Sequence, residues 1–150
     1  MKLVLGCDHG GLAIKNAVNS FLASRADTVS DLGTTTSDSV DYSDYAVCAA
    51  EAIVEKKADM AVLVCTTGIG MSISANRFPG VRAALCESVK AATMTRAHNN
   101  SNVLVLAGAT LSPETAVAIA QAFLDTPFSN EARHQRRVDK LERANRLSEI

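Results

Sequence analysis

Short runs of apolar residues alternate along this chain with longer stretches in which apolar positions recur every three or four residues. The short runs are typical of strands, and the longer stretches are typical of amphipathic helices. Some runs are apolar at almost every position, as expected of strands that are covered by helices on both faces of a sheet. The predicted strands are Lys2–Gly6, Thr28–Asp31, Met60–Cys65, Val81–Leu85 and Asn102–Leu106.

Helices are predicted between and after these strands, at Gly11–Arg25, Tyr42–Lys56, Gly70–Asn76, Ser88–Ala97, Pro113–Leu124 and Asn130–Leu147. Ser112 and Pro113 form a favourable helix start, with serine as N-cap and proline at the first helical position. Strands that alternate with helices at this spacing are typical of βαβ units and a parallel sheet. We therefore expect an α/β fold: a Rossmann-like, three-layer α/β/α single domain over residues 1–150, with five parallel strands in the order 2-1-3-4-5.

The last predicted helix differs from the others because most of it is polar. Its apolar stripe is narrow and consists of Val138, Leu141 and Leu147. Such a helix adds little to the core of its own domain, so we expect it to extend to a partner subunit at a dimer interface. Its basic residues indicate a solvated face or, for a subset, an anion site: Arg133, His134, Arg136, Arg137, Lys140, Arg143 and Arg146.

Composition and charge narrow the classes of function. The chain has 150 residues, of which 47% are hydrophobic and 21% charged, as in folded globular proteins. Its formal net charge of -1 gives no basis for broad binding to nucleic acid or membranes. The N-terminal apolar run Leu3-Val4-Leu5 is too short for a signal peptide or a membrane span. Because the cysteines form no CxxC pair, we expect reduced thiols in a cytoplasmic protein.

Two glycine-containing loops follow the first and third predicted strands, at residues 6–11 and 65–70. In an open parallel sheet, ligands bind at the carboxyl ends of the strands where the strand order reverses, and both loops fit that position. Gly68 and Gly70 allow backbone N–H groups to turn toward an anion or oxyanion. Cys65 stands beside these groups, in a setting where thiols ionise more readily, which makes it a candidate base near neutral pH.

The other cysteines lack such a loop or lie within apolar runs, and we interpret Cys7, Cys48 and Cys86 as core residues. The histidines show no metal-ligand spacing with one another or with a cysteine, so we expect no metal and no cofactor. Asp8 and His9 follow the first strand, where such a pair also serves as a turn or cap. His98 lies at a predicted helix end, where a histidine also satisfies the helix C-terminus.

Taken together, these segments resemble the type-B ribose-5-phosphate isomerase family, which includes the galactose-6-phosphate isomerase subunits. The resemblance extends to about Leu141 and is carried by residues 6–11, 41–42, 65–70, 74–77, 96–99 and 133–138. It implies an enzyme that interconverts ribose 5-phosphate and ribulose 5-phosphate through a cis-enediolate. It also implies a homodimer or dimer of dimers whose active sites are shared between subunits.

The resemblance assigns the proton transfers to a few residues. Cys65 would move the proton between C1 and C2 of the sugar. His98, assisted by Asp8, would open the furanose ring, a proton transfer suited to an imidazole. An oxyanion hole for the enediolate would be formed by Thr67 and the N–H groups of Gly68, Ile69 and Gly70.

The resemblance also assigns substrate contacts. Asn99 would contact the sugar hydroxyls, and Tyr42 would line the sugar site. His134 would be a further phosphate or sugar contact. The phosphate would be bound by His9, Arg133 and Arg137, of which the guanidinium groups are natural partners for phosphate oxygens.

The sequence departs from the family pattern at three places. Thr66 replaces a glycine, Ser43 replaces a proline, and Ala109-Thr110 stand where many members have a phosphate-binding arginine. These differences leave open the same chemistry on another sugar phosphate, such as allose 6-phosphate, galactose 6-phosphate or a tetrulose phosphate.

Two readings outside this family are less favoured. A cysteine phosphatase needs an arginine six residues after the nucleophile, and that position is Met71. A non-catalytic phosphate- or nucleotide-binding module fits the fold class, but the chain has neither a GxGxxG fingerprint nor a P-loop.

Overall fold

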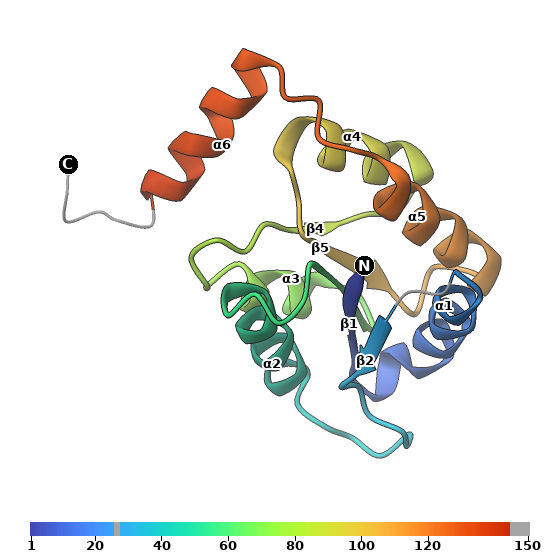
Figure 1. Ribbon diagram of the computed structural model, residues 1–150. Coiled ribbons are helices and arrows are strands. Elements are labelled where there is room, and N and C mark those ends of the chain that lie inside the picture. Colours follow the sequence, from blue (N-terminus) through green and yellow to red (C-terminus); the bar gives the residue numbers. More distant parts are fainter. Residues whose placement is uncertain (26–27, 145–150) are drawn as a thin grey trace.

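Five parallel strands form one sheet at the centre of the molecule (Figure 1). The computed structural model describes residues 1–25 and 28–144. The strands are β1 (Lys2–Cys7), β2 (Thr28–Asp31), β3 (Met60–Cys65), β4 (Ala83–Leu85) and β5 (Val103–Ala107). Strands β1, β3 and β5 are nearly continuous apolar runs with only Lys2 exposed and Met60 half-buried, and they occupy the three central positions of the sheet.

Helices cover both faces of the sheet, as predicted. One face packs against α1 (Leu12–Ser24), α4 (Val89–Asn99) and α5 (Pro113–Asp125). The other packs against α2 (Tyr42–Val54) and α3 (Ile69–Ala75). A short 3-10 turn, His9–Gly11, precedes α1, and α6 (Ala132–Ala144) projects from the body and packs against α4 (Figure 1). The predicted three-layer α/β/α fold is confirmed.

The predicted strand order 2-1-3-4-5 is wrong at one edge. The observed order is β2-β1-β3-β5-β4, so β5 lies between β3 and the edge strand β4. The reason is visible in the two strands. All five residues of β5 are buried, whereas the three residues of β4 are each half-buried. The strand with more apolar surface takes the covered position, and the short strand takes the edge.

The boundaries of the elements follow local chemistry. The Ser112 hydroxyl accepts the N–H of Thr115 at 3.2 Å, and Pro113 opens α5 as predicted. Ser88 caps α4 in the same way through the N–H of Ala91. The predicted strand Val81–Leu85 begins two residues later than expected. Leu147, the last residue of the predicted apolar stripe, lies outside the described residues.

A partly buried ion pair joins α1 to the end of β2. The Lys15 ammonium lies 2.7 Å from the Asp31 carboxylate, and the two side chains are 3% and 28% exposed. The second Asp31 oxygen accepts the N–H of Gly33 at 2.9 Å. The segment that continues from Gly33 is tied to β1, because Thr34 donates its N–H to the Cys7 carbonyl. The pair therefore anchors the chain that leads into the loop before α2.

Removal of Asp31 and removal of Lys15 are expected to lower the free energy of unfolding by different amounts. Asp31→Ala leaves a buried ammonium without its carboxylate and should lower the free energy of unfolding by about 3 kcal/mol. Lys15→Met leaves a carboxylate that is already partly hydrated, and should cost about 1 kcal/mol or less. Urea denaturation of both variants and of the double variant measures these values. Equal costs for the two single variants would contradict this interpretation.

Candidate active site

The loops after β1 and β3 lie side by side at the carboxyl end of the sheet, as predicted. Strands β1 and β3 are paired, with Cys7 opposite Val64, and Asp8 donates its N–H to the Val64 carbonyl at 3.2 Å. On the other side, the N–H of Gly108 bonds to the Cys65 carbonyl at 2.8 Å. The loop that begins at Cys65 is thus held between the ends of both neighbouring strands.

Two glycines permit the close approach of these loops. A Cβ at Gly11 would lie 2.4 Å from the Val64 carbonyl oxygen, and a Cβ at Gly10 would lie 2.1 Å from the Thr66 hydroxyl. A side chain at either position would therefore push the loops apart. The Gly10–Thr66 contact also shows what Thr66 does in this chain: its side chain packs over the backbone of the Asp8–Gly11 turn.

Cys65 ends β3 with its side chain largely covered. The residue is 4% exposed, and its Sγ accepts the N–H of Gly68 at 3.2 Å. Gly68 adopts a left-handed conformation with φ of 75°, which turns that N–H back toward the sulfur. The sulfur is thereby held in a fixed position at the end of β3. The arrangement places a thiol beside the backbone N–H of Gly68 at the start of α3.

Thr67 and the first turn of α3 complete this loop. The Thr67 hydroxyl accepts the N–H of Ile69 at 3.3 Å. Tyr42, at the start of α2, lies against Gly70, because a Cβ built on that glycine would be 2.6 Å from the tyrosine ring. Tyr42 remains 44% exposed, so its ring covers one side of Gly70 and is also open to solvent.

Asp8 and His9 are both fixed by backbone N–H groups. Asp8 is 4% exposed, and its carboxylate accepts the N–H of Gly11 at 3.1 Å. His9 Nδ1 accepts the N–H of Val40 at 3.2 Å. A neutral imidazole whose Nδ1 accepts carries its proton on Nε2 and presents a donor there. Val40 was not singled out in the sequence, since a backbone N–H in a loop has no signature in side-chain pattern.

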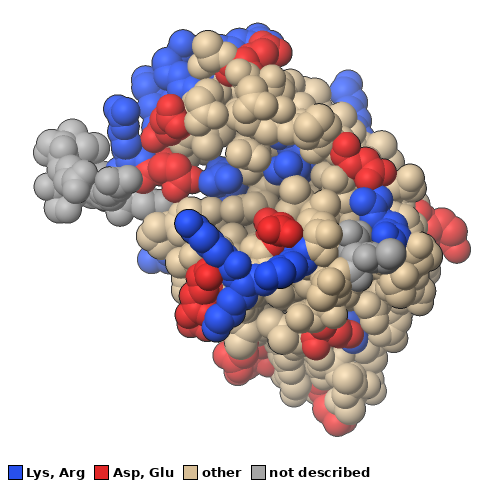
Figure 2. All heavy atoms as spheres, in the orientation of Figure 1, with Lys and Arg blue, Asp and Glu red and all other residues tan. Residues whose placement is uncertain are grey.

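The remaining predicted residues form a second group, at the end of α4 and on α6. His98 and Asn99 occupy the last turn of α4, and Arg133, His134 and Arg137 lie on α6. Figure 2 shows the basic side chains gathered over α6. His134 is buried against His98, whereas both arginines are exposed.

These two groups lie at opposite ends of the sheet. Helix α4 starts after the carboxyl end of β4 and ends before the amino end of β5. The five residues of β5 span roughly 16 Å at the usual rise of a strand. The structure thus brings the Asp8–His9 and Cys65–Gly70 residues together, and it brings His98, Asn99 and the α6 residues together. It does not join the two groups within one chain.

Arg96 anchors the second group. Its side chain is buried, and its guanidinium donates to the Ser101 carbonyl, to Asn100 Oδ1 at 3.1 Å and to the Thr126 carbonyl at 3.3 Å. Burial, followed by the charge of Arg82, lowers the pKa of Arg96. These bonds fix the end of α4 against the segment that leads to α6. Arg96 appeared in the sequence as part of a motif without a role.

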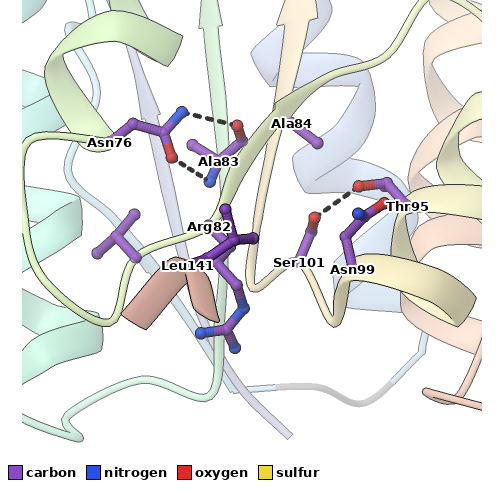
Figure 3. A pocket seen from close by; sticks show the side chains of 9 residues that line it. Asn76, Arg82, Ala83, Ala84, Thr95, Asn99, Ser101 and Leu141 are labelled. Atoms are coloured by element: carbon purple, nitrogen blue, oxygen red, sulfur yellow. Dashed lines mark hydrogen bonds between the residues drawn. The ribbon is translucent and has the colours of Figure 1, made fainter. Parts of the chain in front are cut away.

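A cavity of about 370 Å³ lies beside this second group (Figure 3). Asn76 closes one side, with its amide bonded to both the N–H and the carbonyl of Ala83. Asn99 and Leu141 also line it, while residues 65–70 do not. The cavity therefore does not join Cys65 to Asn99.

The four cysteines differ in exposure. Cys7 and Cys86 are core residues as predicted, and burial raises the pKa of each thiol to about 11. The prediction that Cys48 belongs to the core is wrong, because its side chain is exposed on α2. Ala46, Ala49 and Ala50 are the residues of that helix that face the sheet. Cys48 falls on the opposite side of the 3.6-residue period.

Alkylation of the folded protein at pH 8 is expected to distinguish these thiols. Cys48 should react first and without loss of activity. Cys7 and Cys86 should remain unmodified, because they stay protonated well above this pH and are covered. Mass spectrometry of iodoacetamide-treated protein, with Cys48→Ser as control, gives the order. Early labelling of Cys7 or Cys86 would contradict the described packing.

Within residues 1–25 and 28–144, no group of three or more histidine, cysteine or acidic side chains is arranged to hold a metal ion. No helix in the same part of the chain has the length and hydropathy needed to cross a bilayer.

Comparison with known proteins matches residues 3–141 to the family described as Ribose/Galactose Isomerase. Ribose-5-phosphate isomerase B of Escherichia coli is 37% identical over 140 residues, which cover 93% of each chain. The structure of ribose-5-phosphate isomerase B from Clostridium thermocellum has a TM-score of 0.96 and 37% identity, with 99% of both chains covered. The Mycoplasma genitalium enzyme, solved with bound ribulose-5-phosphate, has a TM-score of 0.92 and 35% identity, covering 97% of this chain and 96% of its own.

A doubly wound sheet with a thiol and backbone donors at its switch point, together with these similarities, defines an enzyme of the aldose–ketose isomerase class. The chain belongs to the ribose/galactose isomerase family. The family resemblance read from the sequence is thereby confirmed.

Proposed function

We propose that this chain interconverts ribose 5-phosphate and ribulose 5-phosphate through a cis-enediolate, with Cys65 as the base and without metal or cofactor. The observation that carries the proposal is the N–H of Gly68 directed at Cys65 Sγ. Aldose–ketose isomerisation moves one proton between adjacent carbons and needs a base beside donors for the oxyanion. The ribulose-5-phosphate bound to the Mycoplasma genitalium relative supports the choice of sugar.

The proton transfer takes place on the open-chain sugar. The Cys65 thiolate removes the proton from C2, which breaks the C2–H bond and leaves an enediolate with its negative charge on O1. We assign stabilisation of the oxyanion to Thr67 and the backbone N–H groups of Gly68, Ile69 and Gly70. Without substrate, the N–H groups of Gly68 and Ile69 are directed at Cys65 Sγ and the Thr67 hydroxyl, and they would have to turn to the oxyanion when it forms. A proton passes from O2 to O1, and the Cys65 thiol returns its proton to C1. The product is the ketose, and the thiolate is regenerated.

Ring opening and phosphate binding use the second group of residues. His98 moves the proton that opens the furanose, with Asp8 assisting, and Asn99 contacts the sugar hydroxyls. Arg133 and Arg137 bind the phosphate together with His9. The bond from Val40 uses Nδ1 of His9, which leaves Nε2 to donate to the phosphate. Because His98 and Cys65 lie at opposite ends of the sheet in one chain, these roles require a second copy of the chain.

The active form is therefore a homodimer or a dimer of dimers with shared sites. Helix α6, within residues 130–147, extends to the partner and carries Arg133 and Arg137 to its Cys65 loop. Two features support this arrangement. Helix α6 projects beside α4 (Figure 1), and apolar side chains remain exposed near both groups, with Ile69 at 55%, Ile73 at 62% and Leu141 at 51%. We place this enzyme in the cytoplasm, with no nucleic-acid or membrane partner.

The test is conversion of ribose 5-phosphate to ribulose 5-phosphate by purified protein in the presence of EDTA. We expect turnover that the chelator does not change. The same assay on allose 6-phosphate, galactose 6-phosphate and a tetrulose phosphate ranks substrates by kcat/KM. A higher kcat/KM for one of these sugars would replace ribose 5-phosphate as substrate, and loss of activity with EDTA would contradict the metal-free mechanism.

A further inference from the structure

Two imidazole rings lie in contact where α4 meets α6. His98 lies on the last turn of α4 and His134 on the first turn of α6, with ring centroids 4.3 Å apart and planes tilted by 34°. His134 is 2% exposed, whereas His98 is only partly covered. The His134 ring therefore packs against one side of the His98 ring, and of the two rings only that of His98 is partly exposed.

The buried ring is held in one orientation. Ser129 Oγ lies 2.7 Å from His134 Nδ1 and also accepts the N–H of Glu131 at 3.3 Å. The hydroxyl and Nδ1 share one hydrogen bond, whose donor depends on the His134 tautomer, and either direction fixes the ring against Ser129. The same serine donates its backbone N–H to the Ala97 carbonyl, one residue before His98. Ser129 thus fixes the His134 ring and ties it to the turn that carries His98.

The surroundings of His134 oppose its protonation. Burial lowers the pKa of His134, as do the neighbouring His98, Arg133 and Arg137, and only Glu131 acts in the other direction. A neutral His134 ring adds no positive charge next to His98. It therefore does not oppose the uptake of a proton by His98. Contact with the substrate, in contrast, would need an exposed edge that a residue 2% exposed does not offer.

We propose that His134 is a positioning residue for His98: its buried ring sets the plane of the His98 imidazole, and it does not itself bind the phosphate or the sugar. This inference rests on the proposed function, which assigns ring opening to His98. The role then requires a flat side chain at position 134. A wrongly oriented His98 ring should slow ring opening without weakening phosphate binding.

The test compares His134→Ala with His134→Phe, which keeps a flat ring for stacking. His134→Ala should lower kcat for ribose 5-phosphate by about tenfold or more with little change in KM. His134→Phe should restore most of the kcat. Ribulose 5-phosphate is acyclic, so exchange of its C1 proton with D2O does not need ring opening and should remain at the wild-type rate in both variants.

These measurements distinguish failure of the role of His134 from failure of the proposed isomerase activity. A matching rise in KM in both variants would show that His134 contacts the substrate and would overturn the inference. So would an unchanged kcat in His134→Ala. Ser129→Ala, which removes the bond to Nδ1 and keeps both rings, should lower kcat no more than His134→Phe does, and a loss as large as that of His134→Ala would show that the Nδ1 bond, not the flat ring, is what matters. Wild-type protein that neither isomerises ribose 5-phosphate nor exchanges the C1 proton would instead overturn the proposed function.

Discussion

Cys65→Ala is expected to lower kcat for ribose 5-phosphate isomerisation by about 10³-fold or more, because it removes the group that carries the proton. The loop should persist, since Gly68 has its left-handed conformation through its own backbone and the Cys65 carbonyl still accepts the N–H of Gly108. KM should change little, because phosphate contacts are made by other residues. Steady-state kinetics in both directions measures the effect.

Cys65→Ser is the matched control for this prediction. A hydroxyl occupies nearly the same space and accepts the same N–H, but it is a far weaker acid than a thiol and is not ionised at neutral pH. We expect Cys65→Ser to be nearly as inactive as Cys65→Ala while it binds substrate normally. Substantial isomerase activity in either variant would show that another group moves the proton.

His98→Ala is expected to lower kcat/KM for ribose 5-phosphate by about 10²- to 10³-fold, within the range of positioned acid–base groups. The cause is loss of enzymatic ring opening, so the variant would depend on the small fraction of open-chain sugar. Proton exchange at C1 of ribulose 5-phosphate should continue, because that step uses Cys65. NMR in D2O measures the exchange.

Comparing isomerisation with C1 exchange in Cys65→Ala and His98→Ala separates the roles of the two residues. Cys65→Ala should lose both isomerisation and C1 exchange, whereas His98→Ala should lose mainly isomerisation of the cyclic sugar. If both variants lost exchange to the same degree, His98 would belong to the proton transfer itself. If His98→Ala had no effect on ribose 5-phosphate, the ring-opening role would be wrong.

Most of the fold could be predicted from the sequence, because each central strand has a strong local signal. The continuous apolar run Met60–Cys65 and the start at Ser112-Pro113 define their elements without tertiary information. The predicted order of the last two strands is wrong because it follows their order along the chain. It takes no account of how long and how apolar each strand is. Ala83–Leu85 is short and half-buried, and Val103–Ala107 is fully buried, so only the latter suits an interior position.

The site was predictable in part. Both loops at the carboxyl end could be placed from the strand pattern, and the paired glycines Gly10 and Gly11 were a signal for close approach that the structure explains. The burial of His134 was not predictable, since it depends on how α6 packs against α4. The Lys15–Asp31 pair was missed because a lysine within a helix is ordinarily a surface residue.

Heterodimers of Cys65→Ala and His98→Ala subunits, purified through two different affinity tags, offer the decisive measurement. If sites are shared, one of the two sites in each heterodimer has both Cys65 and His98, so we expect about half of the wild-type activity from two inactive parents. The reciprocal heterodimer, a wild-type subunit with a subunit carrying both substitutions, should be inactive. Inactivity of the first heterodimer together with half activity of the second would show that each site is complete within one chain, and failure to form dimers at all would equally contradict the shared-site mechanism.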